Sequence, residues 1–205
     1  MKIVLTNAGK RYNRDWIFRH LNFTFEKDNA YAITGSNGSG KSTLLQALSG
    51  AIGFNEGHCK WSFNQKEIAA ENIYRYVSIC APYLELVEEM TLAEFINFHS
   101  KFKPLLKNIT LKQIIEETGL QLAGTKKINQ FSSGMKQRVK LAQCILSDTP
   151  LLLLDEPCTN LDEAGIELYH NLIQKYGEGR MIVVSSNDKV EYSFCNQFIN
   201  IQDYK

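Results

Sequence analysis

The pattern G-x-x-x-x-G-K-[ST] occupies Gly35, Ser36, Asn37, Gly38, Ser39, Gly40, Lys41 and Ser42, with Thr43 directly after it. Glycines let backbone N–H groups point inward around an anion, and the lysine brings positive charge to terminal phosphates. A serine hydroxyl after the lysine suits Mg²⁺, and a helix beginning there offers the positive end of its dipole. The sequence therefore predicts a nucleoside triphosphate site over these residues, with Ser42 as a metal ligand.

Two carboxylates, Asp155 and Glu156, directly follow the apolar run Leu151–Leu154. In open parallel sheets, ligands bind outside the carboxyl ends of the strands. Asp155 is placed to hold Mg²⁺, directly or through water. Glu156 is placed to orient or deprotonate an attacking water. Taken alone, these residues fit a surface turn equally well.

The elements that must position these groups begin with strands. Alternating apolar residues at Lys2–Thr6 and Leu21–Phe25 predict an antiparallel sheet with one wet face. The short apolar run Ala30–Thr34 leads into the glycine-rich loop. A helix is expected over Lys41–Leu48, ending near Gly50.

The middle of the chain is helical. Thr91 and Thr110 each fit the capping-box pattern, with Glu94 and Gln113 three residues later. A third helix is expected over Ser132–Ser147 from its apolar spacing. We therefore expect a helical insert over about residues 84–147.

The last third alternates strand and helix. Glu163–Tyr176 is expected to be a helix, and Met181–Ser185 and Phe198–Ile201 are expected to be strands. This order favours right-handed crossovers and a mainly parallel sheet. We predict one α/β domain, 1–205, with a P-loop NTPase (RecA-like) core, an N-terminal antiparallel β-subdomain and a helical subdomain.

Composition excludes several classes of partner. The net charge of +1 gives no field that favours nucleic acid. No apolar run approaches the roughly 20 residues that span a bilayer, and the N-terminus does not resemble a signal peptide, so we expect a cytoplasmic protein. The five cysteines contain no CxxC pair, which favours reduced, packed thiols.

The stretch Phe131–Arg138 resembles the signature of the ATP-binding cassette (ABC) ATPases, Leu-Ser-Gly-Gly-Gln followed by basic residues. Ser132 and Gly134 match, whereas Ser133 and Met135 replace Gly and Gln. Ser132 and the helix end behind it form an anion-binding group, although an ordinary serine cap fits the same residues. In the family, this end meets the nucleotide of a second subunit.

The resemblance runs from Tyr12 to Asn187 and implies further roles. Tyr12 stands where the family stacks an aromatic ring on adenine. Thr159–Asp162 resembles the loop that contacts the partner subunit, and Asp162 can also cap the helix that follows it. As the family resemblance implies, Ser132, Ser133 and Gly134 would contact the partner subunit's ATP.

Two positions depart from the family. Pro82 stands where a glutamine usually opens the helical subdomain. Tyr83 or Glu85 could substitute for it, but Glu85 fits a solvated acid better. Asn187 replaces a histidine; it can donate a hydrogen bond to a terminal phosphate but cannot take up a proton. We therefore predict slow to moderate hydrolysis that requires dimerisation, with Glu156, Lys41 and Asn187 in the catalytic machinery.

The resemblance implies an ATP-hydrolysing subunit of an ABC transporter that uses ATP and Mg²⁺. Its expected partners are a second copy, or another ABC subunit, and an integral membrane permease. It would lie on the cytoplasmic face of the membrane. Leu84, Leu86 and Val87 would receive part of the permease, unless they simply pack in the core. The alternatives are a soluble ABC ATPase and an ATP-binding switch with weak hydrolysis; co-purification with a membrane protein would separate the transporter subunit from the soluble ABC ATPase.

Overall fold

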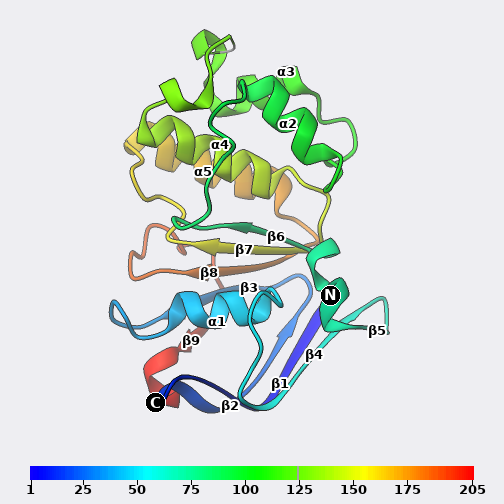
Figure 1. The fold of residues 1–205 in the computed structure, drawn as a ribbon, viewed down its shortest axis with the longest axis vertical. Helices are drawn as coiled ribbons and strands as arrows, with labels where there is room; N and C mark the ends of the chain where they lie inside the picture. Colours follow the sequence, from blue (N-terminus) through cyan, green and yellow to red (C-terminus); the bar gives the residue numbers. More distant parts are fainter. Residues whose placement is uncertain (124) are drawn as a thin grey trace. The chain divides into compact units, whose positions relative to one another are not determined.

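The chain folds into two compact units in this computed structural model, which describes residues 1–123 and 125–205 (Figure 1). The first unit comprises Met1–Ile79, Pro150–Glu156 and Gly179–Lys205. The second comprises Cys80–Thr149 and Pro157–Glu178. No helix in the described ranges is long and apolar enough to cross a membrane.

An antiparallel sheet in the order β2-β1-β4-β5 forms one layer of the first unit. Its strands are β1 (Lys2–Tyr12), β2 (Asp15–Glu26), β4 (Glu56–Phe63) and β5 (Lys66–Ile68). The predicted N-terminal strands are therefore present and longer than expected. The sequence prediction missed β4 and β5, although Cys59, Trp61 and Phe63 of β4 are apolar at alternate positions and pack on the core.

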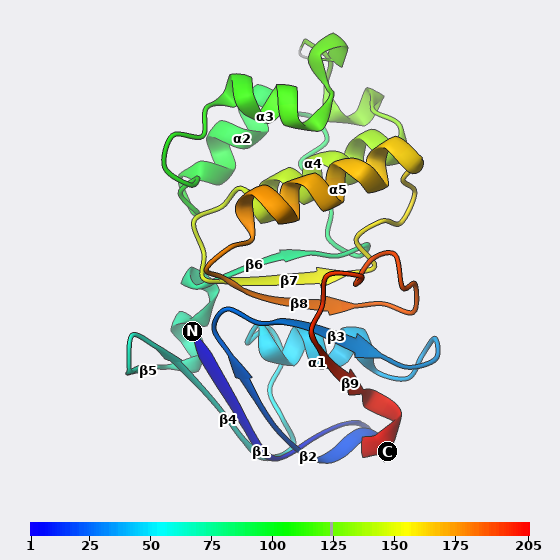
Figure 2. The ribbon, with the colours of Figure 1, turned by 180° about the vertical axis from the view of Figure 1, so that it is seen from behind.

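A second sheet in the first unit has the order β6-β7-β8-β3-β9. Its strands are β3 (Ala30–Thr34), β6 (Val77–Cys80), β7 (Leu151–Asp155), β8 (Met181–Ser185) and β9 (Gln197–Asn200). β8 pairs in parallel with β7 and β3, and β3 pairs in parallel with β9 (Figure 2). Every residue of β7 and β8 is buried, which explains their apolar runs before Asp155 and Ser185. The predicted α/β fold is confirmed.

Helix α1 (Lys41–Leu48) follows β3 and packs on β7 and β8. The residue after it, Ser49, is the C-cap, and Gly50 has a left-handed φ of 77°. The last predicted strand, Phe198–Ile201, is shifted by one residue. Ile201 instead begins the 3-10 turn η4 (Ile201–Tyr204), because the Asn200 side chain caps the backbone N–H of Gln202.

The described part of the second unit contains four α-helices: α2 (Leu92–Ser100), α3 (Leu111–Thr118), α4 (Ser133–Ile145) and α5 (Glu163–Tyr176). Both predicted capping boxes are present, at Thr91 and Thr110. Helix α4 packs against each of the other three. It therefore forms the centre of this unit.

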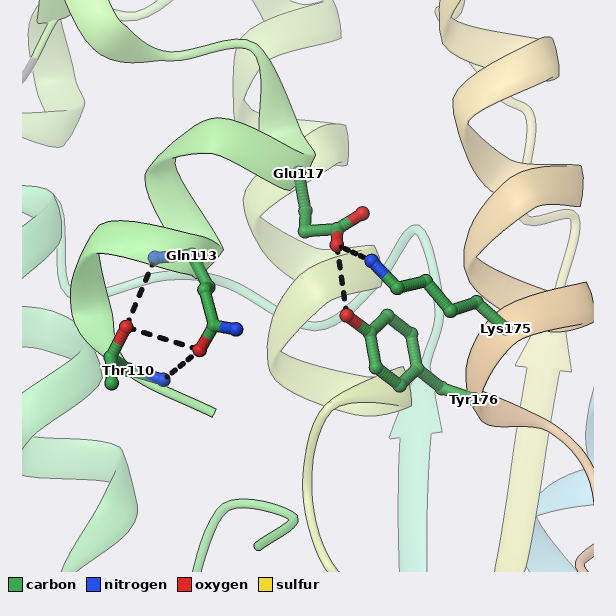
Figure 3. A network of polar contacts seen from close by, with 5 residues as sticks. All are labelled: Thr110, Gln113, Glu117, Lys175 and Tyr176. Atoms are coloured by element: carbon green, nitrogen blue, oxygen red, sulfur yellow. Dashed lines mark hydrogen bonds and ion pairs between the residues drawn. The ribbon is translucent and has the colours of Figure 1, made fainter. Parts of the chain in front are cut away.

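A polar network ties α3 to α5 (Figure 3). Glu117 forms an ion pair with Lys175 and accepts a hydrogen bond from the Tyr176 hydroxyl at 2.8 Å. Burial alone would raise the pKa of Glu117, but hydrogen bonds from these two residues outweigh it and lower the pKa. The Glu117 carboxylate therefore stays charged and links the two helices.

His99, near the end of α2, makes this unit sensitive to acid. Its Nε2 lies 3.0 Å from the Ser147 Oγ, which itself donates to the Gln143 carbonyl at 2.6 Å. Ser147 is thus an acceptor for the neutral imidazole. Burial and the charge of Lys103 lower the pKa of His99 to about 4.

Lowering the pH is therefore expected to destabilise the protein through His99. The folded pKa lies below the ordinary value of about 6.5, so this stability is complete above pH 6.5 and is lost as pH falls towards 4. Between pH 7 and pH 5 we expect a loss of at most about 2 kcal/mol. Urea unfolding of the parent and of His99→Gln at both pH values measures this loss in the free energy of unfolding. A His99→Gln protein that loses as much as the parent would contradict this, and His58→Gln, at an exposed position, is the control.

Candidate functional site

The glycine-rich loop joins β3 to α1 and turns back on itself. Gly35, Gly38 and Gly40 have φ values of 141°, 73° and 108°, which side-chain-bearing residues rarely adopt. A Cβ at Gly40 would also lie 2.2 Å from the Ile17 Cγ2. Glycine is therefore required at Gly40 by both backbone conformation and space.

Lys41 is only 5% exposed, although it carries a charge. Its Nζ donates to the backbone carbonyls of Gly35, at 2.8 Å, and Ser36, at 3.3 Å. A lysine ammonium has three N–H donors, so the two carbonyls leave one donor for an anion. The loop thus holds a charged donor at its centre.

A pocket of about 200 Å³ brings the two predicted motifs together. It is lined by Ile17, Asn37, Gly38, Ser39, Gly40, Lys41, Ser42, Thr43 and Glu156. Ile17, from β2, was not predicted from the sequence. Its only signal was a branched apolar residue in a strand that precedes the loop.

Asp155 ends β7 and is 2% exposed. Its Oδ1 is buried without a hydrogen-bond partner among the described residues, and so is the Oγ of Ser185, its neighbour on β8. An unpaired buried carboxylate oxygen is costly unless a cation or donor satisfies it. The site therefore has the oxygen chemistry that a divalent cation requires.

Glu156 leaves the strand direction immediately after Asp155. Its φ is 43°, and its backbone N–H donates to the Ser185 carbonyl at 2.9 Å. A left-handed backbone at a non-glycine residue is a strained arrangement that is concentrated at functional sites. Here it accompanies a carboxylate that lines the phosphate pocket.

Asn187 and Tyr12 lie in the same unit. The Asn187 Nδ2 donates to the Asn37 Oδ1 at 2.9 Å, so the residue that replaces the family's histidine is bonded to the loop. Tyr12, at the end of β1, is 48% exposed, with the Lys10 Nζ 5.3 Å from its ring centroid. Tyr12 does not line the pocket described above, but its ring is accessible for stacking.

The second unit has its own pocket, of about 590 Å³, at the N-terminus of α4. It is lined by Gly119, Leu120, Ala123, Lys126, Ser132, Ser133, Gly134, Met135, Arg138, Asn160 and Asp162. Ser132 is the N-cap, and its Oγ accepts from the Met135 N–H at 3.2 Å. A Cβ at Gly134 would lie 3.0 Å from the Asn160 carbonyl oxygen, which explains why the smallest residue stands there.

Asp162 caps α5 at the edge of this pocket. Its Oδ1 accepts from the Gly165 N–H at 2.9 Å and from the Arg138 Nη2 at 3.0 Å. These two hydrogen bonds, the first above all, lower the pKa of Asp162. The predicted capping role is therefore present, and the side chain is charged beside the pocket.

The segment that contains Pro82 is held by two lysines of α4. Lys140 donates to the Pro82 carbonyl at 3.2 Å, and Lys136 pairs with Glu88 at 2.6 Å. Within this segment Leu86 is buried, Leu84 is half-buried and Val87 is exposed. Core packing thus accounts for Leu86 but not for Val87.

The phosphate loop, the acidic strand end and the serine-capped helix α4 define a P-loop nucleotide-binding cassette. The chain belongs to the ABC transporter family, whose model matches residues 18–159. The chain is accordingly an ATP-binding and ATP-hydrolysing subunit of an ABC transporter.

Similar proteins span nearly the whole chain. The ABC transporter ATP-binding protein YybJ of Bacillus subtilis is 33% identical over 95% of this chain and 89% of its own. The lantibiotic transport ATP-binding protein SrtF of Streptococcus pyogenes is 28% identical over 95% and 84%. The dimeric ATP-binding cassette MJ0796, in a post-hydrolysis state with ADP and Pi, has a TM-score of 0.82 at 21% identity, covering 97% and 94%. This last likeness confirms the fold.

Proposed function

We propose that the loop Gly35–Thr43 binds the phosphates of ATP. The observation that carries this is the single pocket lined by both the loop and Glu156. Lys41 would donate to the terminal phosphates, and the N-terminus of α1 would add its dipole. Tyr12 would stack on the adenine, with Ile17 beside it.

The residues present fit a magnesium ion. Mg²⁺ is typically bound by one or two carboxylates together with substrate phosphates. Ser42 lines the phosphate pocket and Asp155 carries an unpaired buried oxygen, so these two would hold the ion. When bound, the ion would neutralise charge on the phosphates.

Hydrolysis would depend on Glu156 and Asn187. Glu156 would orient a water or accept its proton. Asn187 would donate to the terminal phosphate through the second N–H of its amide group, since one N–H is bonded to Asn37. Asn187 cannot take up a proton, and Pro82 offers no side-chain oxygen. We therefore propose slow to moderate turnover of ATP.

The pocket at α4 would receive the ATP of a second ABC subunit, either another copy of this chain or a related one. Ser132, Ser133 and Gly134 present the helix end to it, and Lys126 and Arg138 add positive charge. Asp162 would contact the partner. Two ATP molecules would then close the dimer, and hydrolysis would reopen it.

Replacing Ser132 with arginine is expected to block ATP-dependent dimerisation while leaving ATP binding to the single subunit nearly intact. The added side chain would fill the face that must meet the second nucleotide. Sedimentation with ATP in a Glu156→Gln background measures the dimer, with Ser193→Arg, at another exposed serine, as the control. A Ser132→Arg protein that still dimerises would rule out this arrangement.

We further propose that a separate integral membrane protein is the transport partner and that the chain lies on the cytoplasmic face. Relatives that include the bacitracin transport ATP-binding protein BcrA of Bacillus licheniformis and SrtF support a role in transport. The exposed Val87 and Tyr83 beside the Pro82 segment would contact the membrane protein. Co-purification from detergent-solubilised membranes tests this.

A further inference from the structure

Two backbone carbonyls hold the Lys41 ammonium, those of Gly35 and Ser36. The Ser36 carbonyl also accepts from the Ser39 N–H at 3.0 Å, which closes the loop around it. The orientation of these two peptide groups therefore sets the position of the Lys41 charge before a phosphate binds. Anything that fixes them pre-organises the loop.

The turn η4 contacts both residues in succession. A Cβ at Gly35 would lie 2.9 Å from the Cγ2 of Ile201, which is fully buried. The Gln202 Nε2 donates to the Ser36 Oγ at 3.2 Å. Ile201 thus packs on Gly35 and Gln202 bonds to Ser36, the two residues whose carbonyls hold Lys41.

Sheet register explains this match. β3 and β9 pair in parallel, with Ile33 opposite Ile199 and Thr34 opposite Asn200. Continuing each chain past its last paired residue brings residues 35 and 36 beside residues 201 and 202. The alignment follows from the pairing of two strands that are far apart in the sequence.

The turn is itself held in place. The Asn200 Oδ1 accepts from the Gln202 N–H at 3.2 Å, and the Asn200 Nδ2 donates to the Asp203 Oδ1 at 3.3 Å. The turn also packs on β2. Ile201 and Gln202 are therefore presented to the loop from a fixed backbone.

We propose that Ile201 and Gln202 are positioning residues for ATP binding, because they fix the two peptide groups that hold Lys41. This inference rests on the proposed phosphate site. It predicts an effect on the affinity for ATP rather than on the chemical step, since Glu156 directly follows a different strand, β7 (Leu151–Asp155).

Gln202→Met tests the hydrogen bond because methionine keeps the length of the side chain but cannot donate. The loss of one hydrogen bond is expected to raise the KM for ATP roughly three- to ten-fold, with kcat and the melting temperature unchanged. Ser36→Ala should have the same effect. The double variant should be no worse than either single variant, because both remove one interaction. Gln197→Met, at the exposed start of β9, is the control.

Two conservative substitutions test the packing of Ile201. Ile201→Val keeps the Cγ2 methyl group that lies beside Gly35, whereas Ile201→Leu keeps the side-chain volume but loses that branch. We expect the leucine variant to raise the KM for ATP and the valine variant to leave it unchanged. Equal KM values for the two would contradict a role for this contact.

The outcomes separate this inference from the function on which it rests. An unchanged KM in Gln202→Met, or additive effects of Gln202→Met and Ser36→Ala, would overturn the positioning role if Lys41→Ala still abolishes ATP binding. If Lys41→Ala binds ATP normally, the proposed phosphate site itself is wrong. A fall in kcat without a change in KM would also overturn the inference.

Discussion

Replacing Lys41 with alanine is expected to abolish tight ATP binding. The ammonium is nearly buried and is already hydrogen-bonded to the carbonyls of Gly35 and Ser36. The side chain therefore loses little conformational entropy when it binds a phosphate. Hydrogen bonds to charged groups contribute about 1.5–3 kcal/mol each. Each such bond between Lys41 and a terminal phosphate therefore corresponds to a roughly 10- to 200-fold change in affinity.

Calorimetric titration with ATP and Mg²⁺ measures this loss. Lys60→Ala, on the exposed face of β4, is the matched control because it removes the same charge from a site outside the pocket. A thermal melt of Lys41→Ala without nucleotide shows whether the protein is folded. Micromolar affinity in a folded Lys41→Ala protein would contradict the assignment of the loop.

Replacing Glu156 with glutamine is expected to lower kcat for ATP hydrolysis by about 100- to 10,000-fold, the range for losing a general base. Glutamine has nearly the same shape but does not accept a proton at neutral pH. The strained backbone at this position, with φ 43°, is fixed by the bond to the Ser185 carbonyl and should survive the substitution. ATP binding should therefore persist.

Release of inorganic phosphate measures the rate, and sedimentation with ATP measures the dimer. The Glu156→Gln protein should accumulate as an ATP-bound dimer, because the hydrolysis that reopens it is blocked. Glu67→Gln, at an exposed position on β5, is the control. Hydrolysis at the parent rate in Glu156→Gln would show that another group activates the water.

Local chemistry made much of the fold predictable. The capping boxes at Thr91 and Thr110 fixed the starts of two helices, since each box depends on residues three apart. Gly119 ends α3 with a left-handed φ of 69°, a backbone conformation that glycine adopts without steric cost. The candidate site was indicated equally well, because the glycines and Lys41 must be adjacent to enclose one anion.

Segments whose structure depends on distant partners were harder to predict. Residues 51–80 contain β4, β5 and β6, none of which was expected. In β4, Trp61 is buried and donates its indole N–H to the Leu48 carbonyl at 2.9 Å, whereas Cys59 and Phe63 are only partly buried against the core. Three alternating apolar residues are a weak strand signal by themselves, so pairing with β1 and β5 decides the conformation of β4.

The sequence by itself thus determined that a glycine-rich loop before a helix, an acidic strand end and a serine-capped helix exist, because each is made by neighbouring residues. Only the tertiary structure decided that Glu156 shares a pocket with Lys41, that Ile17 closes it, and that Gln202 bonds to Ser36. These relations depend on the register of paired strands. Register is set by burial across the whole sheet, which no local pattern records.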